Sequence, residues 1–146
     1  MPRNGFTLVE LLVVLFILGL AAGAVALTLP TGDDRVRGEA TAFAGKVAAL
    51  RDRAILEGRP VGLWVQPSGY GFEVREDGAW IPLEDAPFAA AINWQNGVLA
   101  QTGGTPRIQL RFDNVGMPST PARIDLTDGE NNAAVEIAAN GDVKAL

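Results

Sequence analysis

The stretch GFTLVELLVVLFILGL, from Gly5 to Leu20, decides the fold of this chain, and its apolar character continues to Leu29. Glu10 is the one charged residue in it, because nothing from Leu11 to Leu29 is ionisable. As a helix rising 1.5 Å per residue, the uncharged part alone would be about 28 Å long, close to the hydrocarbon thickness of a bilayer. The sequence therefore predicts a membrane-length helix with a carboxylate just inside its start.

Two interpretations of this segment are open. As a secretory signal peptide it would end at a small-residue site, Ala22-Gly23-Ala24 or Ala24-Val25-Ala26. However, the apolar run is longer than a usual signal core, and Glu10 is a charge that such a core should lack. As a retained anchor, it would keep its N-terminus in the cytoplasm, because Arg3 precedes it. Both interpretations place the later residues outside the cytoplasm.

Composition argues against an enzyme. The 146 residues include no Cys and no His, which excludes disulfides, thiolate metal sites, Cys nucleophiles and His general bases. The two serines, Ser68 and Ser119, each lie beside a proline and neither stands in a Gly-x-Ser-x-Gly turn. The net charge is −5 and the basic residues are scattered, so the sequence does not indicate a nucleic-acid partner.

Gly5, Phe6 and Glu10, with a basic leader before them and a long apolar helix after them, resemble the class III signal of type IV pilins and pseudopilins. The resemblance implies that a prepilin peptidase cleaves after Gly5 and that the new N-terminal Phe6 is N-methylated. It also implies that the helix stays as an inner-membrane anchor and later forms the core of a filament, with Glu10 acting in assembly.

The chemistry of the new terminus agrees with this role of Glu10. Cleavage after Gly5 would create a cationic amine on Phe6, and Glu10 lies four residues along, on the same face of a helix. Amine and carboxylate can then neutralise each other, within one chain or between neighbours, which lowers the cost of keeping either in apolar surroundings.

After Pro30, which could kink or break the helix, a second helical pattern begins at Val36. Its apolar residues recur at three- and four-residue steps and predict a face that covers a sheet: Val36, Ala40, Phe43, Val47, Leu50 and Ala54. Beyond Pro60 the apolar period becomes two, as in strands, with a hairpin turn at Asp77-Gly78. Residues 84–104 follow no clear period, and we expect a long loop with one short strand there.

The predicted fold is therefore α+β and pilin-like, with a long N-terminal helix, transmembrane in its first half, packed on an antiparallel β-sandwich-like domain. The expected boundaries are a leader at 1–5, a transmembrane and assembly helix at 6–29, a periplasmic amphipathic half of the helix at 30–58, and an antiparallel β domain at 59–146.

The globular part resembles more closely the H-type minor pseudopilins of type II secretion. The likeness rests on ALRDRAI at 49–55 with GRPVGL at 58–63, on YGF at 70–72 leading to WIPL at 80–83, and on a C-terminal pattern at Ile108 to Phe112, Gly116, Ile124 to Leu126 and Gly141. It implies a structural subunit near the tip of the periplasmic pseudopilus. Its partners would be other major and minor pseudopilins, the prepilin peptidase and the inner membrane, which it would cross once with its C-terminal domain in the periplasm.

Two other functions stay open. A minor pilin of a type IV pilus or of a DNA-uptake filament shares much of this pattern, although such pilins often carry a disulfide that this chain cannot form. A secreted binding module behind a conventional signal peptide belongs to another class, and its mature chain would begin at Val25 or Leu27.

The remaining candidate sites are weak. Asp125, Asp128 and Glu130, near Asn131 and Asn132, form an oxygen-rich cluster of the kind that calcium binds. Their spacing is not that of an EF-hand loop, and Asp-Gly followed by Asn-Asn is what a plain turn needs, so the sequence favours a turn, no metal and no cofactor. Trp64, Trp80 and Trp94 could stack on sugars, but aromatic residues in a small β domain more often lie in a core or an interface.

Overall fold

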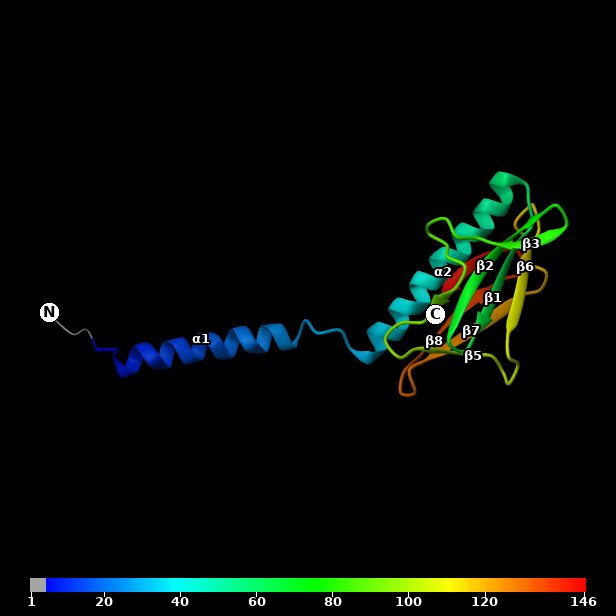
Figure 1. Ribbon diagram of the computed structural model, residues 1–146. Coiled ribbons are helices and arrows are strands. Elements are labelled where there is room, and N and C mark those ends of the chain that lie inside the picture. The colour runs from blue at the N-terminus through cyan, green and yellow to red at the C-terminus, as the bar shows by residue number, and fades with distance from the viewer. Residues whose placement is uncertain (1–4) are drawn as a thin grey trace. The chain divides into compact units, whose positions relative to one another are not determined.

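The computed structural model describes residues 5–146, which contain two helices and nine strands. The chain divides into two compact units, Met1–Thr31 and Gly32–Leu146 (Figure 1). The first unit holds α1 (Leu8–Ala26) and the second holds α2 (Gly32–Glu57) together with every strand. Pro30 therefore lies between two helices, and the question of a kink or a break is answered by a break at residues 27–31.

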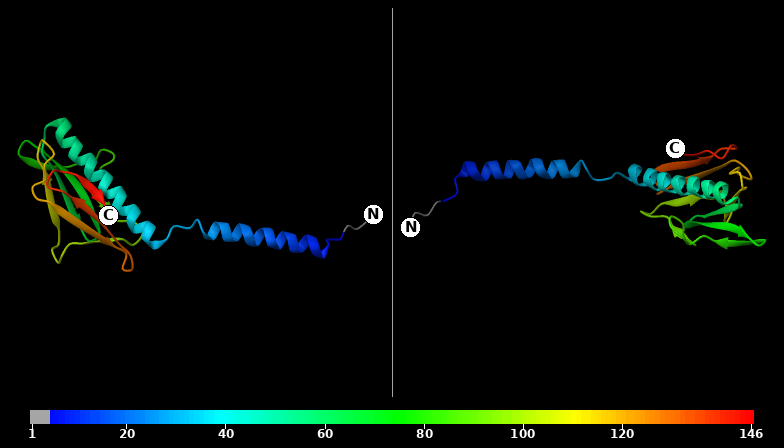
Figure 2. Two further views of the ribbon diagram at one scale, coloured as in Figure 1. Left: turned by 180° about the vertical axis from the view of Figure 1, so that it is seen from behind. Right: turned by 90° about the horizontal axis from the view of Figure 1, so that it is seen from above.

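The helix α2 packs on the β domain through the face that the sequence predicted. All six residues of the predicted stripe are buried, and Ala44 joins them. The helix ends after Glu57 because Gly58 takes a positive φ of 62°, a left-handed conformation that glycine adopts at little cost. This buried face holds α2 on the sheets. Figure 2 shows from two further sides how the helix lies against the strands.

The strands form two antiparallel sheets. Sheet A has the order β3 (Ala79–Pro82), β2 (Gly69–Glu76), β1 (Val61–Gln66), β6 (Ile108–Phe112), with β4 (Ile92–Asn93) also paired to β2. Sheet B has the order β5 (Leu99–Gln101), β7 (Ala122–Thr127), β8 (Asn132–Ile137), β9 (Val143–Ala145). The helix α2 packs on β1 of sheet A and on β7, β8 and β9 of sheet B, so one hydrophobic core joins all three layers. The α+β fold with antiparallel sheets is confirmed.

One expectation about the strands was wrong. Residues 84–104 contain two short strands, β4 and β5, instead of one, and the two belong to different sheets. The segment crosses between the sheets and is held by buried side chains, among them Phe88, Trp94 and Val98. Strands of two and three residues are too short to show a period in the sequence, which explains the error.

An aromatic cluster fills the core below α2. The ring of Phe43 lies 4.8 Å from that of Tyr70 and 5.1 Å from that of Trp94, both in edge-to-face geometry. Phe72 and Phe88 extend the cluster at 5.1 Å from each other. The indole of Trp94 donates to the carbonyl oxygen of Gln66 at 3.3 Å, so this tryptophan is a core residue and not a sugar platform.

Candidate processing and assembly site

The peptide bond between Gly5 and Phe6 lies in a short non-helical segment directly before α1. Both residues are exposed, Phe6 to 79% of its surface, and a Cβ placed on Gly5 would meet no other atom within 4 Å. The bond that the sequence predicts to be cleaved is therefore open to an enzyme. Arg3 and the other leader residues up to Asn4 lie outside the described residues.

Thr7 caps the helix that follows. Its backbone is extended (φ −79°, ψ 149°), and its side-chain oxygen accepts a hydrogen bond from the backbone N–H of Glu10 at 3.2 Å. Thr7 and Glu10 thus stand at the two ends of a Thr-x-x-Glu capping-box sequence. This capping role of Thr7 was not predicted from the sequence, although the Thr-x-x-Glu spacing is visible there.

Glu10 lies in the first turn of α1, where the unpaired backbone N–H groups give the helix a positive end. A carboxylate is favourable at this place. The positive end of the helix would, in contrast, repel the cationic amine that cleavage before Phe6 would leave. Glu10 is exposed, so its charge is available both to an amine of its own chain and to one of a neighbouring chain. The structure therefore places Glu10 at the helix start, with its side chain exposed.

Beyond Glu10, α1 is apolar on all sides. Its 19 residues have a mean hydropathy of 2.7 in the most apolar window, and the helix is long and apolar enough to cross a membrane. Considered by itself, the helix has no buried residue. A helix that is apolar all round requires an apolar environment, which lipid or other helices of the same kind can supply.

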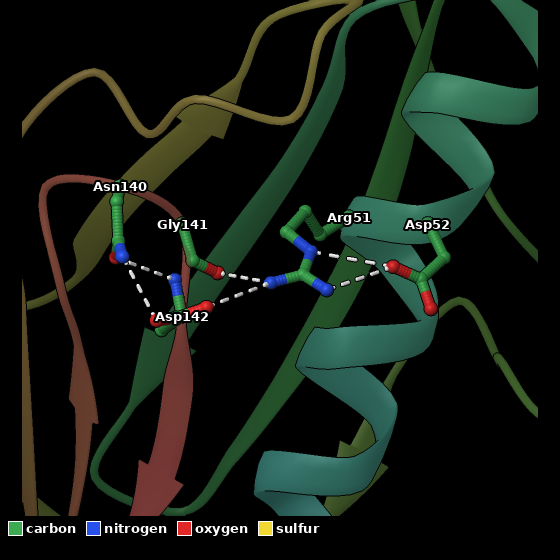
Figure 3. A network of polar contacts seen from close by, with 5 residues as sticks. All are labelled: Arg51, Asp52, Asn140, Gly141 and Asp142. Atoms are coloured by element: carbon green, nitrogen blue, oxygen red, sulfur yellow. Dashed lines mark hydrogen bonds and ion pairs between the residues drawn. The ribbon is translucent and has the colours of Figure 1, made fainter.

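In the globular unit, some of the residues behind the H-type likeness meet at one junction: Arg51, Asp52, Ile55, Gly116 and Gly141. Arg51 of α2 donates from Nη1 to the carbonyl oxygen of Gly141 at 2.7 Å, and Nη2 donates to Asp52 at 3.0 Å (Figure 3). A Cβ on Gly141 would clash with the carbonyl oxygen of Gly116, and one on Gly116 would lie 2.8 Å from the Ile55 side chain. The two turns and the helix therefore approach one another as closely as glycine allows.

Two of the three calcium candidates, Asp125 and Asp128, are engaged in other interactions. Asp128 accepts from the backbone N–H groups of Glu130 and Asn131 at 3.0 and 2.7 Å, and these bonds hold the pKa of its carboxyl below the usual value. Asp125 pairs with Arg123 at 2.9 Å, and Glu130 is exposed. Residues 5–146 contain no group of three side chains that could hold a metal ion. The cluster forms a turn.

That turn lies at the start of α2. A Cβ on Gly32, the first residue of the helix, would lie 2.5 Å from Nδ2 of Asn131 and 3.4 Å from Oδ2 of Asp128. A carboxylate placed there interacts favourably with the helix dipole. The oxygen-rich cluster thus lies directly beside the helix N-terminus in this unit.

Comparison with known proteins adds the family. The model of the family described as type II transport protein GspH matches residues 39–141, and the prokaryotic N-terminal methylation motif matches residues 1–26. Type II secretion system protein H of Pseudomonas aeruginosa is 30% identical over 94% of this chain and 91% of its own length. Protein H of Aeromonas hydrophila is 33% identical over 56% of this chain, and the alignment spans 46% of that relative's length.

The fold has solved counterparts as well. The minor pseudopilin EpsH from the type 2 secretion system of Vibrio cholerae superposes with a TM-score of 0.65 at 20% identity, over 77% of this chain and 97% of that one. At this identity the likeness concerns the fold alone, which is the pilin-like fold that the sequence predicted. The family match covers more than two thirds of the chain, and the methylation motif covers the helix before it. This chain belongs to the type II transport protein GspH family, the H-type pseudopilins.

Proposed function

We propose that this chain is a minor pseudopilin that serves as a structural subunit near the tip of the periplasmic pseudopilus of type II secretion. The observation that carries the proposal is the joint occurrence of two features in one chain. One is the globular unit that matches the GspH model, and the other is the methylation motif that ends in a membrane-length helix. Neither feature provides chemistry, so we assign the chain no catalytic role.

Maturation would begin at the exposed bond between Gly5 and Phe6. A prepilin peptidase would cleave there and Phe6 would be N-methylated, since the bond precedes a capped helix start and the motif spans it. Methylation keeps the amine cationic, so the pairing with Glu10 would persist in the mature chain.

The mature chain would be held in the inner membrane by α1, with its N-terminus in the cytoplasm and residues 32–146 in the periplasm. The apolar length of α1 and the basic residue Arg3 before it support this orientation. On assembly, α1 would leave the lipid and pack among the equivalent helices of other major and minor pseudopilins. The charge pair between a new Phe6 amine and Glu10 would set the register between neighbours.

The experiment that tests the proposal is mass spectrometry of the mature chain. A pseudopilin gives a protein that begins at N-methylated Phe6 and stays in the inner-membrane fraction. A secreted binding module would instead begin at Val25 or Leu27 and would be recovered free of the membrane, which would overturn the proposal.

A second measurement separates type II secretion from a type IV pilus. Deletion of the gene should stop export of type II substrates across the outer membrane while surface pili and DNA uptake persist. Loss of pili with secretion intact would assign the chain to the pilus instead.

A further inference from the structure

The outward face of sheet A carries a tryptophan between arginines. Trp80 of β3 pairs with Arg75 of β2, and Arg111 lies across on β6. The guanidinium of Arg111 lies 4.8 Å from the centre of the Trp80 ring and that of Arg75 lies 5.4 Å from it. A Cβ on Gly62 of β1 would already touch the same ring at 3.4 Å, so the indole lies low over the sheet. Both arginines thus gather around one aromatic side chain.

A hollow of about 240 Å³ adjoins this group. It lies at the end of the domain where α2 ends, since Pro60 follows that helix, and Figure 1 shows β3 there. Its lining is mostly apolar, with one guanidinium, one carboxylate and one hydroxyl among the apolar side chains: Pro60, Trp80, Arg111, Phe112, Asp113, Met117, Pro118 and Ser119. Met117 is 44% exposed. The hollow therefore offers an apolar floor with a positive charge at its edge.

The polar groups around the hollow divide into used and unused ones. Asp113, also in the lining, accepts from the backbone N–H groups of Val115 and Met117 at 3.0 and 2.8 Å, so its carboxylate serves the turn. The indole N–H of Trp80, in contrast, is buried and has no acceptor among residues 5–146. A buried donor without an acceptor costs stability, but a nitrogen with no exposed surface is not a contact for a partner, so the free charges at this hollow are those of the guanidinium groups.

The arginines of the group also lack carboxylate partners. Within the described part of the chain, six arginines form an ion pair: Arg37, Arg51, Arg53, Arg59, Arg107 and Arg123. Arg75 and Arg111 form none among these residues, and neither does Arg35 of α2. The chain has 17 acidic and 12 basic residues, so carboxylates are in excess. Two unpaired guanidinium groups on one aromatic ring in an acidic protein form a surface complementary to an external carboxylate.

We propose that this Trp80 hollow is the docking site for an acidic side chain, next to an apolar one, on another pseudopilin subunit. The carboxylate would bind the Arg111 guanidinium, while the apolar neighbour would fill the floor at Met117 and Pro118. Arginine and tryptophan in a partly enclosed pocket are the residue types that contribute most to protein interfaces. The inference rests on the proposed function, because it names a surface for a partner of the same filament.

The test is site-specific photo-crosslinking in the full-length chain. A photoreactive phenylalanine replaces Met117 in cells that make the other pseudopilins of the same secretion system, each with a different epitope tag. We expect an adduct with one tagged pseudopilin, and we expect Arg111→Glu to lower its yield by about tenfold. Trp80→Phe, which keeps an aromatic ring but offers the two guanidinium groups a smaller face, should lower the yield by a smaller factor. Arg123→Glu, at an exposed arginine of sheet B, is the matched control and should leave it unchanged.

A charge reversal identifies the acidic partner residue. An Asp→Arg or Glu→Arg change at the crosslinked segment of the partner should restore the adduct in the Arg111→Glu chain. Three outcomes would each overturn the inference and leave the proposed function standing. The first is an equal yield of adduct in wild type and Arg111→Glu, and the second is an adduct only with a second copy of this chain. The third is the absence of any adduct from a chain that is processed and incorporated. A wild-type chain that does not enter the filament at all would overturn both.

Discussion

Arg51 and Gly141 are 90 residues apart in the chain, yet Nη1 of the arginine donates to the glycine carbonyl oxygen at 2.7 Å. The same nitrogen lies 3.7 Å from the Asp142 carboxylate, and Asn140 in turn donates to Asp142 at 2.8 Å. One guanidinium therefore ties the turn before β9 to the helix α2. This junction links the last strand of sheet B to the element that covers both sheets.

Replacing Arg51 by alanine should lower the free energy of unfolding of residues 32–146 by about 1 to 2 kcal/mol, because a charge-assisted hydrogen bond to a part-buried carbonyl is lost. Arg123→Ala removes an exposed ion pair and should cost less than about 1 kcal/mol. Urea unfolding of the globular unit measures both. An equal cost for the two variants would mean that the junction stabilises the domain no more than an exposed ion pair does.

Gly141→Ala tests the close approach at the same junction. Gly141 and Gly78 have nearly equal positive φ, 86° and 82°, but a Cβ on Gly78 would meet no atom within 4 Å. Gly78→Ala should therefore cost only the left-handed strain of about 1 to 2 kcal/mol. Gly141→Ala should cost about 1 to 3 kcal/mol more, because its Cβ clashes with the Gly116 carbonyl oxygen. Similar melting temperatures for the two variants would contradict the tight packing.

Periodicity alone was enough to predict much of this fold. The buried face of α2 and the hairpin at Asp77-Gly78 follow from local spacing, which a sequence displays directly. The junction of Arg51 with Gly141 could not be predicted in this way, because nothing local marks a contact across 90 residues. The same limit applies to the Trp80 hollow. Its residues come from β3 and β6, which lie in one sheet only because β2 and β1 pair between them.

Tyr70 should make the domain sensitive to alkali. Burial, and then the nearby Glu39 carboxylate, raises the pKa of Tyr70 to about 12, above its ordinary value of 10.0. The neutral phenol is therefore favoured in the folded state. The contribution of Tyr70 to the free energy of unfolding is complete below about pH 10 and is lost as the pH rises to about 12. The free energy lost over this range is about 2 to 3 kcal/mol.

The chain has one tyrosine, so the absorbance of its tyrosinate reports on Tyr70 alone. We expect its midpoint well above that of free tyrosine, together with a fall in unfolding free energy over the same range. Tyr70→Phe should flatten that fall, although it also removes the hydrogen bond from Lys46 at 3.3 Å. A midpoint at the ordinary tyrosine value in the folded protein would show that the phenol is not buried.

Calcium should leave the melting temperature unchanged. Asp128 already accepts from two backbone N–H groups, and Asn131 donates from Nδ2 to its other oxygen at 3.1 Å, so a cation would have to replace all these bonds. Asp125 would in addition have to leave Arg123. Thermal unfolding with added calcium and with a chelator checks this, and a rise in melting temperature with calcium would restore the metal hypothesis.

Glu10 allows the two roles suggested by its position to be separated. Glu10→Ala should still insert into the membrane and be cleaved after Gly5, because the peptide bond and the apolar helix are unchanged, but it should assemble poorly. Glu10→Gln retains the side-chain hydrogen bonding that a capping box can use with Thr7 but carries no charge. If the carboxylate acts as counter-ion to the Phe6 amine, the Gln variant should fail to assemble as the Ala variant does.

The measurements are the mass of the mature chain and its amount in isolated filaments. Thr7→Ala serves as the control, since it removes the cap that accepts from the Glu10 N–H at 3.2 Å but leaves both charges in place. We expect this variant to assemble far better than either Glu10 variant. Normal assembly of Glu10→Gln together with failure of Thr7→Ala would reverse the conclusion, because the helix start would then matter and the charge would not.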